Sequence, residues 1–221
     1  MPSTGAEPAA ESLRDKYDWA GKPSTQPSEV MAQYDEFAPS YDDTLLADWG
    51  YEAPARAAEL LAQHVSLESN VLDAGCGTGL TGRELHRVGF AAVHGADISV
   101  ASLRLAARKG IYRSLVHADL LRPLPFSADT FDAAICVGVL SYISGEEFFR
   151  ELCRVTRAGG ALVLSHRTDL IASRSFEDLL RSFEDQGLWS PVSESASLPY
   201  LPKHPDFADR IQVRYFALRV R

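Results

Sequence analysis

The sequence has few cysteines, no long apolar run and no excess of positive charge. Its three cysteines, Cys76, Cys136 and Cys153, cannot all pair with one another and include no Cys-x-x-Cys spacing, which favours a reducing compartment. No apolar run approaches the ~18–20 residues of a membrane-spanning helix. Residues 1–19 also lack the basic start and apolar stretch of a secretory signal. We therefore predict a cytoplasmic protein with no membrane partner.

Metal-binding spacings and basic patches are also missing. The six histidines are scattered and form no His-x-x-x-His pair, so we predict no metal site. The net charge of −8 is unevenly spread, because residues 1–43 hold nine acidic side chains against three basic ones. The remainder is nearly neutral. This distribution offers no basic surface to a phosphate backbone, and we expect no nucleic-acid partner.

Composition divides the chain into two parts. Residues 1–28 are rich in Pro, Ser, Ala and Gly without sustained periodicity, which predicts a flexible N-terminal arm with a short helix near Leu13–Trp19. Residues 29–221 alternate helical and strand patterns. We interpret them as one domain, since nothing in this stretch requires a second.

Short apolar runs alternate with helical patterns along this domain. The runs predict strands at residues 70–74, 91–96, 113–118, 131–137, 161–165 and 211–220. The periodic segments predict helices around residues 57–65, 80–88, 99–109, 146–155 and 176–183. Ser99 is a candidate cap for the third of these helices, and Ser175 with Asp178 a candidate capping pair for the last.

This alternation predicts an α/β fold. We expect a doubly wound, mostly parallel seven-stranded sheet with helices on both faces and an antiparallel last strand. In such sheets ligands bind beyond the carboxyl ends of the strands, where the strand order reverses.

A glycine-rich loop follows the first strand. Residues 71–79 read Val-Leu-Asp-Ala-Gly-Cys-Gly-Thr-Gly, and glycine lets the backbone approach a ligand closely. Leu80 stands where a dinucleotide-binding Gly-x-Gly-x-x-Gly loop has its third glycine. Asp73, two residues before Gly75, would repel a pyrophosphate but can receive an amino group. The loop therefore favours a ligand that carries an ammonium group.

Five segments in order resemble the motifs of class I, Rossmann-like, S-adenosylmethionine-dependent methyltransferases. The first is the glycine loop. The second and third are the acids that end the next two strands, Asp97 and Asp119. The fourth joins Leu124-Pro-Phe126 to Thr130-Phe-Asp132, and the fifth is Arg154-Val-x-Arg-x-Gly-Gly160. The resemblance covers about residues 69–166 and implies S-adenosyl-L-methionine as the cofactor.

The resemblance also implies a set of cofactor-binding residues. Asp97 would accept the ribose hydroxyls, Asp119 would contact the adenine amino group, and the Leu120 amide would face the adenine ring. The set is Tyr34, Tyr41, Asp73, Gly75, Cys76, Gly77, Asp97, Ile98, Asp119, Leu120 and Val137. Two structural alternatives stay open: Asp97 as a cap partner of the helix at 99–109, and Asp119 as an ordinary turn residue.

A narrower resemblance lies on either side of these motifs. Tyr34-Asp-x-x-Ala-Pro-x-Tyr-Asp42 and Ser165-His-Arg-Thr-Asp169 resemble the methyltransferase-like group named after the Williams–Beuren syndrome chromosomal region. Tyr41, Tyr142 and His166 are candidate catalytic residues, since a base is needed only where the acceptor loses a proton before it is methylated. The alternatives are that Tyr34 and Tyr41 pack the arm onto the body and that His166 is a core imidazole.

The expected function is methyl transfer to an oxygen or nitrogen of a small molecule. The stretch Cys136-Val-Gly-Val-Leu-Ser-Tyr142 lacks the Pro-Pro-aromatic motif of exocyclic-amine nucleic-acid enzymes, and a Pro-Cys nucleophile is absent as well. A protein acceptor and a non-catalytic cofactor-binding module remain alternatives. Asp73 and Leu80 disfavour a nicotinamide oxidoreductase. We expect a monomer or a homodimer.

Overall fold

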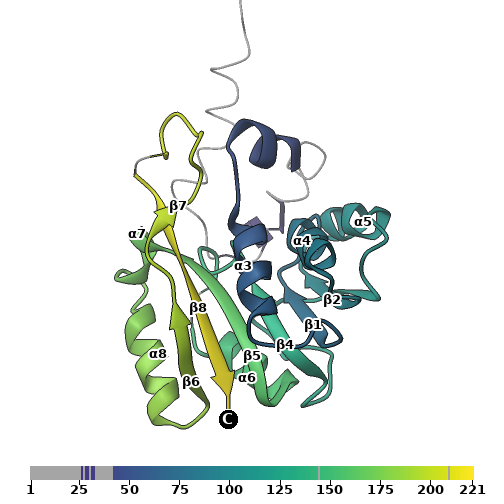
Figure 1. Ribbon diagram of the computed structural model, residues 1–221, viewed down its shortest axis with the longest axis vertical. Coiled ribbons are helices and arrows are strands. Elements are labelled where there is room, and N and C mark those ends of the chain that lie inside the picture. Colours follow the sequence, from purple (N-terminus) through teal and green to yellow (C-terminus); the bar gives the residue numbers. More distant parts are fainter. Residues whose placement is uncertain (1–25, 27, 30, 33–41, 144, 209) are drawn as a thin grey trace, which may run out of the picture.

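The apolar runs of the sequence form the strands of one sheet (Figure 1). The computed structural model describes residues 26, 28–29, 31–32, 42–143, 145–208 and 210–221. In chain order the strands are β1 (Asn70–Ala74), β2 (Ala92–Asp97), β3 (Ser114–His117), β4 (Phe131–Cys136), β5 (Thr156–Arg167), β6 (Trp189–Glu194), β7 (Leu198–Pro199) and β8 (Gln212–Val220).

The strand order is β3-β2-β1-β4-β5-β8-β6, and the two-residue β7 pairs with β8 at the side of this path. Strands β1 to β5 pair in parallel, whereas β8 runs antiparallel to both β5 and β6. The chain moves outward from β1 to β3 and then returns to place β4 against the other side of β1. This confirms the predicted doubly wound fold and puts the reversal of strand order between β1 and β4.

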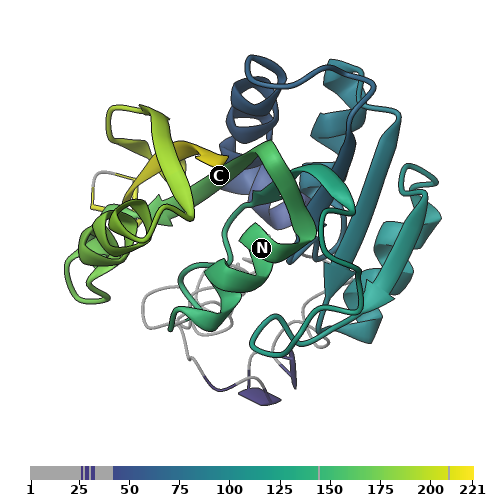
Figure 2. The ribbon, with the colours of Figure 1, turned by 90° about the horizontal axis from the view of Figure 1, so that it is seen from below.

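Helices cover both faces of the sheet (Figures 1 and 2). They are the single π-helical turn η2 (Thr44–Asp48) and the α-helices α3 (Ala53–Ala62), α4 (Leu80–Val88), α5 (Val100–Arg108), α6 (Glu147–Val155), α7 (Thr168–Ile171) and α8 (Phe176–Asp185). Among the residues that the structure describes, none of these helices combines the length and the apolar character needed to cross a membrane.

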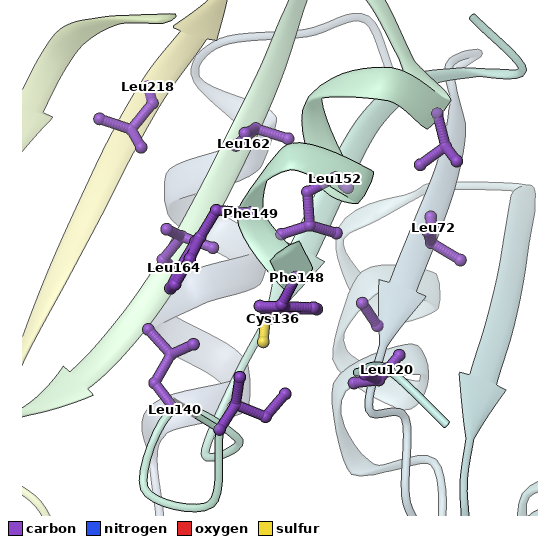
Figure 3. Packing of buried hydrophobic residues seen from close by; sticks show 14 of the residues in the cluster. Leu72, Leu120, Cys136, Leu140, Phe148, Phe149, Leu152, Leu162, Leu164 and Leu218 are labelled. Atoms are coloured by element: carbon purple, nitrogen blue, oxygen red, sulfur yellow. The ribbon is translucent and has the colours of Figure 1, made fainter. Parts of the chain in front are cut away.

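Two hydrophobic cores result from the alternation of side chains along each strand. In β1, Val71 belongs to the core under α3 and α4, while Leu72 belongs to the core under α6 and α8. Figure 3 shows the second core, where Phe148 and Leu152 of α6 pack against Leu162 of β5. Val71 and Leu72 are both fully buried. The strand that leads into the glycine loop is therefore packed on both of its faces.

The helix ends test the predicted caps. The Ser99 side chain accepts a hydrogen bond from the Ser102 N–H at 3.0 Å, which confirms Ser99 as the cap of α5. The capping pair predicted for α8 is wrong. Ser175 has a left-handed φ of 49° and makes no side-chain cap bond, and Asp178 instead binds Arg181 at 2.6 Å. A serine in this conformation does not direct its hydroxyl to the free N–H groups of the first turn.

The N-terminal predictions fall largely outside the described residues. The flexible arm at 1–28 and its short helix near Leu13–Trp19 lie there, as do Tyr34 and Tyr41. From Asp42 onward the chain is described again, and η2 leads through Tyr51 into α3.

Candidate cofactor site

A cavity opens at the carboxyl ends of the central strands, where the strand order reverses. It measures about 870 Å³ including its open mouth. Its lining comes from the segment before α3 and from the loops that follow β1, β2, β3 and β4. The lining residues are Tyr51, Pro54, Gly75, Cys76, Gly77, Thr78, Leu80, Thr81, Asp97, Ile98, Asp119, Leu120, Leu121, Val137, Gly138, Val139, Tyr142 and Ile143.

The glycine loop forms one wall of this cavity. The Gly75 and Cys76 N–H groups both donate to the Ala96 carbonyl, at 2.8 and 3.1 Å, and fasten the loop to the end of β2. Gly75 has φ +79°, and a Cβ at this position would lie 2.3 Å from a methyl carbon of Val139. Only glycine lets the loop pass this closely beside the segment after β4. At Gly77, by contrast, a Cβ would meet nothing within 4 Å, so the backbone there faces open space.

The Asp97 carboxylate connects the loop to the next helix. Oδ2 accepts the Gly77 N–H and Oδ1 accepts the Ser99 N–H, each at 2.8 Å. The same side chain lines the cavity. The alternative in which Asp97 is a cap partner of the helix at 99–109 therefore holds in part. Asp97 binds the N–H at the start of α5, and it also lines the cavity.

Asp119 lies two residues beyond the end of β3, whose last residue His117 pairs with Asp97. Its Oδ1 accepts the Leu121 N–H at 2.9 Å, an Asx turn that orients the carboxylate. It lines the cavity together with the neighbouring Leu120. Two strand-terminal carboxylates thus face the same space, as the parallel arrangement of β2 and β3 requires.

Most of the predicted site residues meet in this cavity. Those that line it are Gly75, Cys76, Gly77, Asp97, Ile98, Asp119, Leu120, Val137 and the catalytic candidate Tyr142. Burial raises the pKa of the Cys76 thiol well above its usual value, which suits a packing residue and not a reactive thiolate. Tyr34 and Tyr41 are outside the described residues.

Asp73 is not part of the lining. Its carboxylate is fully buried, and Oδ2 accepts a hydrogen bond from the Tyr112 hydroxyl at 2.7 Å. Within the described part of the chain Oδ1 has no hydrogen-bond partner. Burial raises the pKa of Asp73 to about 7, against the opposing effect of the Tyr112 hydrogen bond. The carboxylate is thus absent from the cavity lining, and its direct contact with a ligand amino group stays a prediction.

His166 also lies elsewhere. It belongs to β5, is 3% exposed and packs edge-on against Phe176 with 4.7 Å between ring centroids. Burial lowers the pKa of His166 to about 4, so the ring is neutral near pH 7. His166 does not line the cavity. Its surroundings match the alternative given above, in which His166 is a core imidazole and not a catalytic base.

Sequence reasoning did not find the contacts that hold the loop from outside. Lys109, just past α5, donates from Nζ to Asp42 Oδ2 at 2.7 Å and to the Thr78 carbonyl at 2.6 Å. The Thr78 hydroxyl donates to the other oxygen of Asp42. Asp42 closes the Tyr34–Asp42 motif, which was the only sequence signal for this clamp. The clamp fixes a residue of the cavity wall, since Thr78 lines the cavity.

The residues of the cavity fit S-adenosylmethionine. A carboxylate after β2 and another after β3 can accept hydrogen bonds from ribose hydroxyls and an adenine amino group, and the open backbone at Gly77 leaves room beside the loop. Apolar side chains such as Leu120 and Val137 line the same cavity and could pack against the purine ring.

Comparison with known proteins identifies a methyltransferase domain. Residues 72–164 match the family model described as a methyltransferase domain. The chain is 37% identical over 169 residues to human Methyltransferase-like protein 27, covering 71% of this chain and 66% of that protein. It is 34% identical over 140 residues to demethylmenaquinone methyltransferase of Mycolicibacterium paratuberculosis, covering 62% and 59%. The chain thus spans about three fifths to two thirds of these relatives' length.

Solved structures share the fold at lower identity. The [4+2]-cyclase SpnF superposes with a TM-score of 0.68 at 18% identity, covering 90% of this chain and 98% of that one. Geranyl diphosphate C-methyltransferase from Streptomyces coelicolor A3(2), solved with Mg²⁺, geranyl diphosphate and S-adenosyl-L-homocysteine, gives 0.60 at 19% identity, covering 76% and 79%.

The strand order, the site and these matches define a class I methyltransferase domain of the Rossmann-like type, with S-adenosylmethionine as its cofactor. This chain carries a methyltransferase-domain match over residues 72–164 and is similar to Methyltransferase-like protein 27. The narrower resemblance to the Williams–Beuren group stays a prediction.

Proposed function

We propose that this protein transfers the methyl group of S-adenosylmethionine to an oxygen or nitrogen of a small-molecule acceptor. The observation that carries this proposal is the single cavity in which the cofactor loop meets a mostly apolar wall, built by Tyr51, Pro54 and the segment after β4. Two similar proteins, named as acting on demethylmenaquinone and on geranyl diphosphate, support a small molecule.

The chain's own residues would bind, orient and exclude water. The bound cofactor supplies a methyl group that its sulfonium charge already activates, so alignment of the acceptor is the main requirement. Asp97 would accept the ribose hydroxyls and Asp119 the adenine amino group. Asp73 would reach the amino group of the cofactor only through a bridging water, because its carboxylate is buried outside the cavity lining.

Tyr142 is the catalytic candidate that the cavity retains. It lines the cavity in the segment after β4, at the carboxyl ends of the strands where sheets of this topology bind their ligands. We propose that its hydroxyl contacts the acceptor. We also propose that Tyr34 and Tyr41 contact the cofactor. They belong to the segment before Asp42, which we expect to close over the cofactor.

Turnover of the labelled cofactor tests the proposed function. Purified protein is incubated with methyl-labelled S-adenosylmethionine and either a panel of phenols, alcohols and amines or a protein extract. Label in small molecules supports the proposal, and label in protein alone would favour a protein acceptor. Tight binding of S-adenosylhomocysteine with no transfer to any acceptor would favour a non-catalytic binding module. A cyclase shares this fold, so fold similarity alone does not decide among these outcomes.

A further inference from the structure

The wall of the cavity carries charge only where we place the cofactor. Among the described residues that line it, the charged ones are Asp97 and Asp119, assigned above to ribose and adenine. Tyr51, Val139 and Ile143 stand on the remaining wall, where Lys, Arg and His are absent from the described lining. An anionic acceptor would lose its water there without gaining a counter-charge.

Two guanidinium groups that contact residues beside the cavity wall also bind other partners. Arg167, 5% exposed, binds Asp169 through Nε at 3.1 Å and Nη2 at 2.8 Å. Arg174 donates from Nη2 to the Ser141 carbonyl at 2.8 Å, which fixes the segment beside Tyr142. Neither arginine belongs to the lining. Arg167 therefore neutralises the Asp169 carboxylate, and Arg174 binds a backbone carbonyl. Neither charge is presented to an acceptor in the cavity.

Tyr51 places a hydroxyl group at the end of β4. The residue is 7% exposed, lines the cavity and precedes α3. A Cβ on Gly138 would lie 2.7 Å from the Tyr51 hydroxyl oxygen, and Gly138 has φ +74°. The Gly138 N–H donates to the Ser165 hydroxyl at 2.9 Å. The glycine is therefore required for the close approach of the phenol to the backbone after β4.

Tyr200 holds this phenol in place. The two rings meet edge-on, with centroids 5.3 Å apart and planes at 80°. Burial raises the pKa of Tyr200, and its hydrogen bond with Tyr51 opposes that rise. The Arg167 guanidinium lies 5.9 Å from the centre of the Tyr200 ring. Tyr51 is thus a fixed hydrogen-bonding group on the wall of the cavity, beside the end of β4.

We propose that the acceptor half of the cavity takes an uncharged molecule with an apolar body, and that the Tyr51 hydroxyl forms the hydrogen bond that orients its reacting hydroxyl or amine. Tyr200 is a positioning residue for Tyr51. This inference rests on the proposed methyl transfer and adds to it the chemical class of the acceptor and the residue that recognises it.

Binding of matched neutral and anionic probes tests the acceptor class. Calorimetry on the full chain saturated with S-adenosylhomocysteine compares 2-naphthol with 6-hydroxy-2-naphthoate and geraniol with geranyl phosphate. We expect the neutral member of at least one pair to bind, and its anionic partner to bind at least ~10-fold more weakly. Equal or tighter binding of the anion overturns the inference, as does binding of neither member of either pair.

Three variants test the assignment of Tyr51. Tyr51→Phe keeps the ring and should lower the affinity for the neutral probe roughly 3- to 10-fold, which is the usual effect of one lost hydrogen bond. Tyr200→Phe should weaken it less. Tyr215→Phe removes a hydroxyl from an equally buried ring that does not line the cavity, and should leave probe binding unchanged.

The affinity for S-adenosylhomocysteine separates this inference from the proposed function. In all three variants we expect it to stay within about twofold of the parent value. A Tyr51→Phe protein that loses S-adenosylhomocysteine affinity but binds 2-naphthol normally would make Tyr51 a cofactor residue and overturn its assignment. If the parent protein fails to bind S-adenosylhomocysteine at all, the proposed function and this inference both fall.

Discussion

The Tyr112 hydroxyl lies between Asp73 and the first turn of α4, donating to Asp73 Oδ2 at 2.7 Å and accepting the Gly82 N–H at 3.1 Å. The ring fills the space that a side chain at Gly82 would need, since a Cβ there would lie 2.2 Å from the ring carbon bearing the hydroxyl. Tyr112 thus fixes the buried carboxylate from a residue 39 positions away in the chain.

The buried Asp73 predicts a pH-dependent stability. Its pKa is raised by burial from 3.8 to about 7, so between these values the folded state holds a proton that the unfolded state has lost. Raising the pH through this window therefore lowers the free energy of unfolding, by up to ~4 kcal/mol. We expect Asp73→Asn to remove this slope and to be relatively more stable at pH 8 than at pH 5.

Denaturant unfolding of both proteins at pH 5 and pH 8 provides the measurement. The comparison uses the difference between them, because His166 acts in the opposite direction: its pKa is lowered to about 4, so its contribution to stability grows as the pH rises from about 4 to 6.5. Identical pH slopes in the parent and in Asp73→Asn would show that Asp73 does not titrate in this range.

Ligand binding should stabilise the folded protein. At ~100 times its dissociation constant, S-adenosylhomocysteine adds ~2.7 kcal/mol to the free energy of unfolding, which raises the melting temperature by several degrees in a chain of this size. Differential scanning fluorimetry with S-adenosylhomocysteine, and with NADH as the comparison, gives the result. A shift with NADH alone would point to a different cofactor.

The central part of the fold was readable from the sequence because its signals are local. Strands β1 to β4 and the middle of β5 are short runs rich in apolar residues, and Ser99 caps α5 through a bond to a residue three positions on. The edge strand β6 was missed because Trp189–Glu194 contains Pro191 and exposes most of its residues, which leaves no apolar alternation to detect.

The site was readable to the extent that its residues end strands. Gly75 follows β1, Asp97 ends β2 and Asp119 lies just after β3, and parallel strands bring such positions together. The positions of Asp73 and His166 depend on burial by distant side chains, and a motif does not encode that burial. The contacts of Tyr51 and Tyr112 join segments far apart in the chain and leave no pattern in it.

The clamp between Asp42 and Lys109 should contribute to cofactor affinity. Both side chains are partly buried, 29% and 23% exposed, and their Nζ–Oδ2 distance is 2.7 Å. Asp42→Asn weakens the ion pair and the contact with Thr78, so the cavity wall loses its external support. We expect a roughly 3- to 10-fold loss of S-adenosylhomocysteine affinity by calorimetry.

The neighbouring Asp43 is the matched control, because Asp43→Asn makes the same charge change at an exposed position and should leave the affinity unaltered. Truncation extends the test to the arm. Removal of residues 1–28 should change the affinity only a few-fold, whereas removal of residues 1–44 also removes Asp42 and should weaken binding sharply. Equal affinity of the two truncated proteins would refute a role for the clamp and for the segment before it.

Asp97 should serve both the fold and the cofactor. Asp97→Ala leaves the Gly77 and Ser99 N–H groups without their acceptor, which should lower the free energy of unfolding by ~1.5–3 kcal/mol. It also removes the proposed ribose contact, and loss of hydrogen bonds to a charged acceptor should cost ~2–4 kcal/mol of binding, roughly 30- to 1000-fold in affinity. Asp97→Asn should be milder in both respects, because the amide keeps one acceptor oxygen.

Ser99→Ala separates the two roles of Asp97. Ser99 is fully buried, caps α5 and does not line the cavity, so its loss should cost ~1 kcal/mol of stability and leave cofactor affinity within a few-fold. Melting without ligand and calorimetry with S-adenosylhomocysteine are measured on the same preparations. If Asp97→Ala loses stability and yet binds as the Ser99→Ala protein does, then the carboxylate acts only on the loop and the helix. A combined loss, with affinity far below that of Ser99→Ala, shows that Asp97 contributes to binding beyond its support of α5, through the ligand or through its hydrogen bond to the Gly77 N–H of the cofactor loop.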